Sequence, residues 1–314
     1  MIKNYSALIA NSKYCPFCGG HRLRFFEEKD STGPNILSIV ECKVCLVAWQ
    51  LPKKTSRRDS LSFFNKQYSD SEKGVSEYFN EEQRKKTAAL EMSFVRSLRS
   101  GPGSLLDVGA GMGFFVSEAI ANGWQAIGVE PAAEGVAKAK SLGNDAILNC
   151  ALSGLTDGRK FDIVTLWDVI EHVNDPLSFL EEASRRVQEN GYLIIECINY
   201  QSADVIEYLE NHWIWQLDHM WYLTPPVLET LLRQIGFNKF VYADRVFRAD
   251  YKAGGKRKPS LLGFVKKVIR RPHKLIAEIG IYCRLMNSYN RLYQWIDKPI
   301  FVVAAQKSSE KRNV

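Results

Sequence analysis

The chain has 314 residues, of which 46% are hydrophobic and 25% are charged, and its formal net charge is +7. These values exclude a disordered chain, and no stretch approaches the ~18 apolar residues of a membrane-spanning helix. The N-terminal residues lack the apolar core of a signal peptide, so we expect a cytoplasmic protein whose seven cysteines are reduced or metal-bound. The length suits one large α/β domain and a smaller unit.

Two C-x-x-C pairs come first along the chain. The four cysteines are Cys15, Cys18, Cys42 and Cys45. Two tight turns that aim four thiolates at one point are typical of a structural zinc site, in which the protein fills all four positions. Residues 23–26 and 36–41 alternate as strands that join the turns. We therefore predict a zinc ribbon over residues 1–52 that depends on Zn²⁺ for its stability, with free or redox-active cysteines as the alternative.

The next segment, residues 53–103, reads as a helical connector. Apolar residues recur at helical spacing from Ser76 to Arg99, and the run Ser-Gly-Pro-Gly at 100–103 is a strong stop signal. We expect this helix to pack on the following domain and to help close its ligand site.

A strand, a glycine-rich turn and a helix follow at residues 104–108, 109–113 and 114–122. This geometry brings backbone N–H groups and a helix N-terminus close to a nucleotide-like ligand. The third glycine is Gly113, one residue earlier than in the dinucleotide pattern, where Phe114 stands instead. Glu130 follows the next strand, where a carboxylate can accept both hydroxyls of a ribose.

Strands and helices then alternate in the manner of a doubly wound parallel sheet. The predicted strands are residues 104–108, 125–129, 145–149, 161–167, 192–198, 237–243 and 300–305, and the predicted helices are residues 114–122, 132–142, 176–189 and 224–236. We place this core at residues 104–247 and 299–307.

Polar and aromatic residues gather after the strand at 161–167. Its carboxyl end delivers Trp167 and Asp168 to the edge where ligands bind in open α/β sheets, and Glu171 and His172 follow. The segment 211–222 is dense in Trp, His and Tyr, and we expect it over the same edge. Its His219 is the better candidate for a base, because the unperturbed pKa of histidine lies near neutral. The alternatives are a helix cap for the first group and a core aromatic cluster for the second.

The combination of these motifs resembles the zinc-ribbon class I S-adenosylmethionine-dependent methyltransferases of bacterial surface-glycan and secondary-metabolite biosynthesis, with a core like that of the ubiquinone-type enzymes. The resemblance covers residues 15–243 and the last strand, and it implies a Rossmann-like seven-stranded methyltransferase sheet. It implies that S-adenosylmethionine is held by Asp107, Gly109, Ala110, Gly111, Gly113, Glu130, Pro131, Trp167 and Asp168. Our candidate catalytic residues are His219 and His172. In some quinone methyltransferases, residues matching Asp168, Glu171 and His172 bind a divalent ion such as Mg²⁺. One departure is Asn149, where many relatives have an acidic residue for the adenine amino group; Asn149 itself or backbone groups would take that role.

The expected function is methyl transfer to a small-molecule acceptor, foremost a hydroxyl of a sugar or glycan that can be lipid-linked, with a quinone or other phenol as a close variant. A nucleic-acid (RNA) methyltransferase is the first alternative. It is disfavoured because the run Trp-Asp-Val-Ile at 167–170 replaces the Asn/Asp-Pro-Pro-aromatic motif of base amino-group methylation. A catalytically inactive cofactor-binding protein is the second, and the intact glycines and Glu130 argue against it.

The positive charge is concentrated between Arg245 and Lys274, which contain eleven Lys or Arg and one acidic residue, so the remainder of the chain is net negative. We treat residues 248–298 as a basic helical insert. Residues 260–271 have the pattern of an amphipathic basic helix that can lie on the inner face of a membrane, dock on its own domain or contact a partner. The sequence gives no indication of the oligomeric state.

Overall fold

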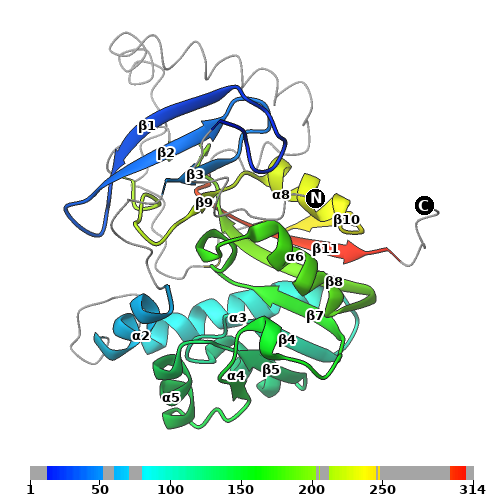
Figure 1. The fold of residues 1–314 in the computed structure, drawn as a ribbon. Coiled ribbons are helices and arrows are strands. Elements are labelled where there is room, and N and C mark those ends of the chain that lie inside the picture. Colours follow the sequence, from blue (N-terminus) through cyan, green and yellow to red (C-terminus); the bar gives the residue numbers. More distant parts are fainter. Residues whose placement is uncertain are drawn as a thin grey trace.

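The computed structural model describes residues 13–51, 60–70, 80–202, 205, 212–244, 247 and 298–308. The predicted basic helix at 260–271 lies outside these residues. The described residues form a large sheet flanked by helices and a small sheet beside it (Figure 1). None of the helices in these ranges is long and apolar enough to cross a membrane.

The large sheet has seven strands in the order β10-β11-β8-β7-β4-β5-β6. Their bounds are β4 (Ser104–Val108), β5 (Gln125–Val129), β6 (Ile147–Leu148), β7 (Phe161–Leu166), β8 (Val187–Ile198), β10 (Phe237–Tyr242) and β11 (Ile300–Lys307). The strands from β6 to β8 are parallel, and β11 runs antiparallel to both of its neighbours. The predicted α/β methyltransferase sheet is therefore confirmed.

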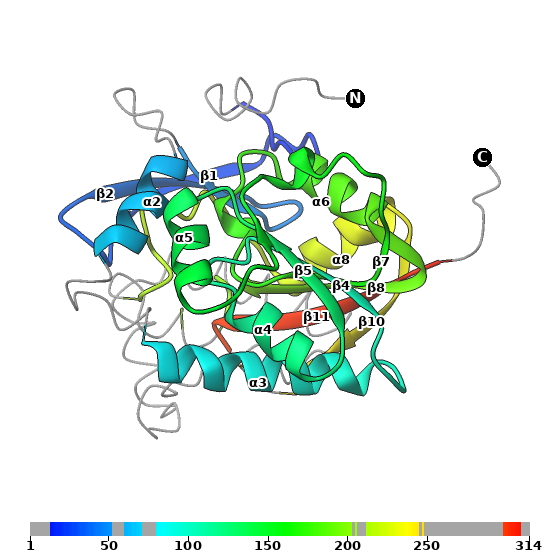
Figure 2. The ribbon, with the colours of Figure 1, turned by 90° about the horizontal axis from the view of Figure 1, so that it is seen from below.

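Helices cover both faces of this sheet, which explains why its central strands are continuous apolar runs. The helices are α3 (Glu81–Ser97), α4 (Phe114–Ala121), α5 (Ala133–Ser141), α6 (Pro176–Arg185) and α8 (Pro225–Gln234). Seen from below, α3 and α4 lie on one face and α6 and α8 on the other (Figure 2). Leu105 and Leu106 of β4 and Ile163 of β7 are fully buried, although neighbouring side chains on a strand point to opposite faces.

Local sequence signals start these helices. The Asn80 side chain accepts a hydrogen bond from the backbone N–H of Gln83 at the start of α3, and Asp175 does the same for Ser178 at the start of α6. Proline occupies the first helical position of α6 and of α8. Thr224 stands at the N-cap of α8 as predicted, but its side chain makes no capping hydrogen bond.

The small sheet is antiparallel and has the order β1-β2-β3-β9. Three of its strands, β1 (Leu23–Lys29), β2 (Ile36–Cys42) and β3 (Ala48–Gln50), come from the cysteine-bearing segment, and β9 (Trp221–Tyr222) comes from far along the chain. The side chains of Trp49, Trp221 and Tyr222 are fully buried at this junction. The small sheet is thus joined to the large α/β unit through a strand that comes from the later part of the chain.

Three local expectations differ from the structure. The helix expected over 176–189 ends at Arg185, because Val187 already pairs with Phe161 as the start of β8. The strand expected over 145–149 is limited to β6 at the sheet edge. Helix α2 (Ser60–Asp70) and strand β3 were not expected, and the strand is too short to show alternation.

Candidate active site and metal centre

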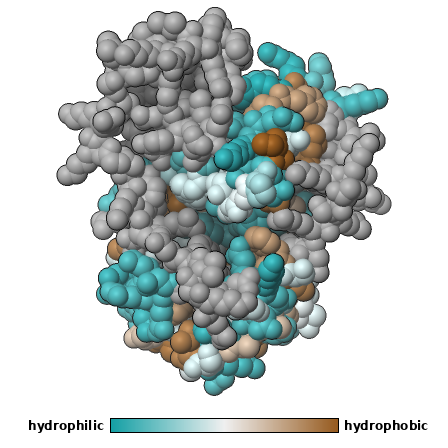
Figure 3. Space-filling view, turned by 90° about the vertical axis from the view of Figure 1, so that its left-hand side faces the viewer, coloured by the Kyte–Doolittle hydropathy of each residue, from teal (hydrophilic) through white to brown (hydrophobic). Residues whose placement is uncertain are grey.

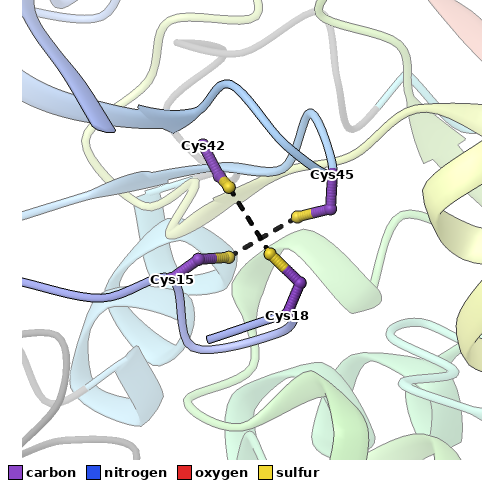
Figure 4. A group of neighbouring side chains, drawn as sticks. All are labelled: Cys15, Cys18, Cys42 and Cys45. Carbon is purple, nitrogen blue, oxygen red and sulfur yellow. Dashed lines mark hydrogen bonds between the residues drawn. The ribbon is translucent and has the colours of Figure 1, made fainter. Parts of the chain in front are cut away.

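The four cysteines form a compact cluster between two turns of the small sheet (Figure 4). The Sγ atoms of Cys15 and Cys45 are 3.5 Å apart, those of Cys18 and Cys42 are 3.6 Å apart, and all four lie within 4.8 Å of one another. A tetrahedral zinc site with Zn–S bonds of about 2.3 Å places its sulfurs about 3.8 Å apart. The donor set and its geometry therefore fit a structural Zn²⁺, as predicted.

The glycine-rich turn after β4 depends on backbone conformations that favour glycine. Gly109, Gly111 and Gly113 have φ values of +76°, +53° and +75°. A Cβ atom added at Gly109 would lie 2.7 Å from Cγ2 of Val169, and one added at Gly113 would lie 2.6 Å from Nδ2 of Asn144. A Cβ atom added at Gly111 would lie 2.9 Å from the Tyr68 hydroxyl, so glycine at these positions lets other groups approach the backbone closely, which suits a ligand cradle.

Glu130 lies at the carboxyl end of β5 and holds the glycine turn in place. One carboxylate oxygen accepts the backbone N–H of Gly111 at 2.9 Å, and the other accepts that of Ala132 at 2.8 Å. Burial raises the pKa of this carboxyl group, and these two backbone hydrogen bonds oppose the rise. Each oxygen keeps a lone pair for a further donor.

Asp107 is the last polar residue of β4, and it is buried. Its carboxylate accepts a hydrogen bond of 2.7 Å from the Thr165 hydroxyl of the neighbouring strand. Burial raises the pKa of Asp107 to about 7, while the Thr165 hydroxyl and the positive charge of Arg84 act in the opposite direction. A cation placed here would favour the ionised carboxylate.

A cavity of about 600 Å³ runs along the carboxyl ends of β4, β5 and β7. We call one set of its lining residues the glycine group: Asp107–Met112, Phe114, Phe115, Val129–Ala132, Ala151 and Leu152. We call a second set the histidine group: Thr32, Phe64, Glu171–Asn174, Phe179, Trp213, Gln216, Asp218 and His219. Viewed from the side of α2, the molecule is hollowed near its middle and has a mixed hydrophilic and hydrophobic surface (Figure 3).

The cavity brings together almost all of the predicted cofactor residues. Trp167 and Asp168 line it beside the glycine group, whereas Gly113 lies behind the turn against Asn144. Asn149 is not among the lining residues, because its side-chain amide donates to the backbone carbonyls of Glu130 and Pro131. Ala151 and Leu152 stand on that wall instead.

The two predicted catalytic histidines lie side by side in the histidine group, with ring centroids 4.9 Å apart. Nδ1 of His219 is 2.7 Å from the backbone carbonyl oxygen of Ile214, so it carries the proton and leaves the lone pair on Nε2. Burial and, to a lesser extent, the neighbouring His172 lower the pKa of His219 to about 4. Nδ1 of His172 lies 3.1 Å from the carbonyl oxygen and 3.5 Å from the carboxylate of Asp218.

The structure brings together a different set of possible metal ligands from the Asp168, Glu171 and His172 set that the resemblance offered for Mg²⁺. Glu171, His172 and His219 offer ligand atoms within 4.8 Å of one another, and Asp168 lies outside this group. Mg²⁺ prefers oxygen ligands in near-octahedral geometry, so one carboxylate with two imidazoles does not fit it. The N-cap of the short helical turn Ile170–His172 carries no side-chain capping hydrogen bond, and the backbone carbonyl of Glu171 accepts the N–H of Met220 at 2.8 Å, which ties this turn to β9.

Several lining residues were not predicted as site residues. Thr32 comes from the β1–β2 turn, Phe64 and Gln67 come from α2, and Arg84 comes from α3. These positions carry no motif, and they reach the cavity only because distant elements pack together. Gln216 and Asp218 could have been found, since both lie in the aromatic segment that contains His219.

Comparison with known proteins agrees with this geometry. Residues 79–240, more than half of the chain, match a family model described as a methyltransferase domain. The chain is 31% identical over 174 residues to the ubiquinone biosynthesis O-methyltransferase of Azorhizobium caulinodans, covering 50% of this chain and 69% of that enzyme. It is 31% identical over 144 residues to the enzyme of the same name from Rhodopseudomonas palustris, covering 42% of this chain and 57% of that one.

The solved structures support the fold. A chain from the complex of the Haloferax volcanii Trm112 methyltransferase activator with a methyltransferase matches with a TM-score of 0.52 and 13% identity, covering 81% of this chain and 100% of that one. Fold, cavity and family match together define a class I S-adenosylmethionine-dependent methyltransferase. The chain belongs to this methyltransferase domain family and is distantly related to the ubiquinone O-methyltransferases.

Proposed function

We propose that this methyltransferase acts on a hydroxyl oxygen of a small-molecule acceptor, foremost a sugar or glycan, and that His219 serves as its base. The observation that carries the proposal is the fixed tautomer of His219. Its Nδ1–H is held by the Ile214 carbonyl, so the neutral imidazole of this cavity-lining residue keeps Nε2 as a proton acceptor. Burial keeps this ring neutral at physiological pH.

The glycine group fits S-adenosylmethionine. The glycines of its turn let the backbone approach a ligand closely, Glu130 offers carboxylate oxygens for the ribose hydroxyls, and Asp107 suits the cationic ammonium group. Arg84 lines the same cavity and can pair with the carboxylate of the cofactor. S-adenosylmethionine supplies a methyl group on a sulfonium, which leaves as a neutral thioether when the acceptor oxygen takes the methyl.

The histidine group supplies the rest of the chemistry. His219 takes the acceptor's proton at Nε2, and the carboxylates of Asp218 and Asp168 stabilise the imidazolium that results. The ring of Trp213 can stack on a sugar face, while Thr32 and Gln216 can hydrogen-bond ring hydroxyls. Alignment of the acceptor oxygen with the methyl group supplies much of the rate acceleration.

A phenolic acceptor is the second candidate, and a specific observation favours it. The curated relatives with the matches given above are named as ubiquinone biosynthesis O-methyltransferases. The aromatic rings of Phe64 and Phe179 in the cavity wall would also accept a flat phenol.

The test is a methyl-transfer assay with radiolabelled S-adenosylmethionine and zinc-loaded protein. The acceptor panel contains nucleotide sugars, free glycosides, catechols, hydroxybenzoates and total RNA. We expect label on the oxygen of a sugar, and label on a catechol would select the second candidate. Label on RNA, or no label on any acceptor by a protein that binds the cofactor, would overturn the proposal.

A further inference from the structure

We infer that the four-cysteine ribbon is a working part of the acceptor side of the site: it holds the segment that carries His219 in place and supplies Thr32 to the cavity wall. The zinc centre would then be needed for methyl transfer and for order in residues 212–223, but not for cofactor binding. The catalytic role of His219 rests on the proposed function; the positioning of its segment does not.

Strand β3 is the first connection. The backbone N–H of Gln50 donates to the carbonyl of Met220 at 2.9 Å. The Gln50 side-chain amide faces the carbonyls of Leu217 and His219, and both hydrogen bonds are 3.1 Å long when its nitrogen points toward them. One residue of the ribbon therefore holds the carbonyl groups of three residues at and beside His219, namely Leu217, His219 and Met220.

The β1–β2 turn is the second connection. Asp30 is buried, and its carboxylate accepts hydrogen bonds from the backbone N–H and hydroxyl of Thr32 and from the amide of Asn35. The ordered turn places Ser31 against the same segment, where its backbone N–H donates to Trp215 at 2.7 Å and its hydroxyl donates to Trp213 at 3.0 Å. The next residue, Thr32, lines the cavity.

The two turns that carry the cysteines also contact the rest of the protein directly. Phe17 lies between the first two cysteines, and its ring packs edge-on against Trp221 with centroids 5.2 Å apart. The Trp221 indole N–H in turn donates to the carbonyl of Val173, next to His172. At the second turn, the carbonyl of Leu46 accepts the Tyr200 hydroxyl at 2.9 Å, so both turns are anchored to the core.

The glycine group has a different support. The backbone N–H groups of Gly109 and Ala110 both donate to Val129 of β5, and that of Gly111 donates to Glu130. These partners belong to the large sheet, so loss of order in the ribbon should leave the cofactor cradle in place. The two sides of the cavity can therefore be separated by experiment.

The first test uses Gln50→Ala and Ser31→Ala in zinc-loaded protein. Their matched controls are Gln188→Ala and Ser141→Ala, whose side chains also donate to carbonyls but lie on exposed surface elsewhere. We expect hydrogen exchange of amides 212–223 to become about tenfold faster in Gln50→Ala, with a smaller change in Ser31→Ala and none in the controls. Affinity for S-adenosylhomocysteine, measured by calorimetry, should stay within about twofold.

With an acceptor from the panel, Gln50→Ala should lower kcat by up to about 10²-fold, because a small displacement of a catalytic group is costly. Unchanged exchange in both ribbon variants would overturn the inference, as would a parallel loss of S-adenosylhomocysteine affinity. If no acceptor is methylated, the proposed function fails, while the exchange and calorimetry data still decide this inference.

The second test removes the metal. Zinc-stripped protein, verified by elemental analysis, should still bind S-adenosylhomocysteine, but it should lose protection at residues 212–223 and recover it on addition of zinc. Loss of S-adenosylhomocysteine binding together with zinc, or retained protection without zinc, would contradict the inference.

Discussion

The two sides of the cavity are built in different ways. The glycine group comes mainly from one continuous piece of chain, in which β4, its turn and the end of β5 support one another by local hydrogen bonds. The histidine group is assembled from the ribbon, α2, the turn after β7, α6 and the segment before β9. The first side resembles a preformed cradle, whereas the second depends on contacts between distant parts of the chain. Changes to one side should therefore leave the other side working.

The largest expected effect is on the histidine side. His219→Ala should lower kcat by about 10²- to 10⁴-fold, because it removes the proposed base, and leave S-adenosylmethionine affinity unchanged. The control is His21→Ala, which changes an exposed histidine of the ribbon. If His219→Ala turned over at the wild-type rate in the radiolabel assay, His219 would not be the base of the reaction.

The second largest effect is the pH dependence of stability that His219 gives to the histidine side. The pKa of His219 is about 4 in the fold, below its ordinary value of 6.5, so the fold favours the neutral ring. The free energy of unfolding therefore contains the full contribution of neutral His219 above pH 6.5. This contribution decreases by about 3 kcal/mol in total as the pH falls toward 4. Urea unfolding of wild type and His219→Asn at pH 4 to 7 measures this difference. Parallel curves would show that His219 is not buried in neutral form.

On the glycine side, Gly109→Ala should weaken S-adenosylmethionine binding at least about tenfold, because left-handed backbone strain of about 1–2 kcal/mol adds to the contact with Val169. Gly158 has a φ of +68° and open space around it, so Gly158→Ala is a matched control for strain alone. Calorimetry should show normal affinity in the control. Equal losses in both variants would mean that strain, not the cradle, sets the affinity.

The smallest expected effect concerns Asp107. Its pKa of about 7 means that part of the population is protonated near neutral pH, and a bound cation favours the ionised form. Affinity for S-adenosylmethionine should therefore rise as the pH increases from 6 to 7, by less than about tenfold. Asp107→Asn should remove this rise. A rise of the same size in the variant would assign the pH dependence to the ligand itself.

The same contrast explains what the sequence could predict. The strand at 104–108, the glycine turn and Glu130 are contiguous signals, and they lie where they were expected. The four cysteines were found from their spacing alone. By contrast, Thr32, Gln50 and Arg84 carry no local signal, since their roles arise from packing between segments far apart in the chain.

Strand β9 makes the same point for the fold. It has two residues, Trp221 and Tyr222, and its partners Ala48 and Trp49 lie far earlier in the chain. No period can be recognised in two residues, so the aromatic segment was expected over the sheet edge but not inside the ribbon sheet. Similarly, the family resemblance offered Asp168, Glu171 and His172 as one candidate ion site, whereas tertiary packing brings His219 to Glu171 and His172 instead.

The central claim is that the glycine side binds S-adenosylmethionine through Glu130. The most direct measurement is calorimetric titration of zinc-loaded wild type, Glu130→Ala and the exposed-site control Glu189→Ala with S-adenosylmethionine. We predict binding by wild type and control, and loss of binding by Glu130→Ala, whose glycine turn also loses its hydrogen bond at Gly111. No binding by folded wild type, or undiminished binding by Glu130→Ala, would contradict this account.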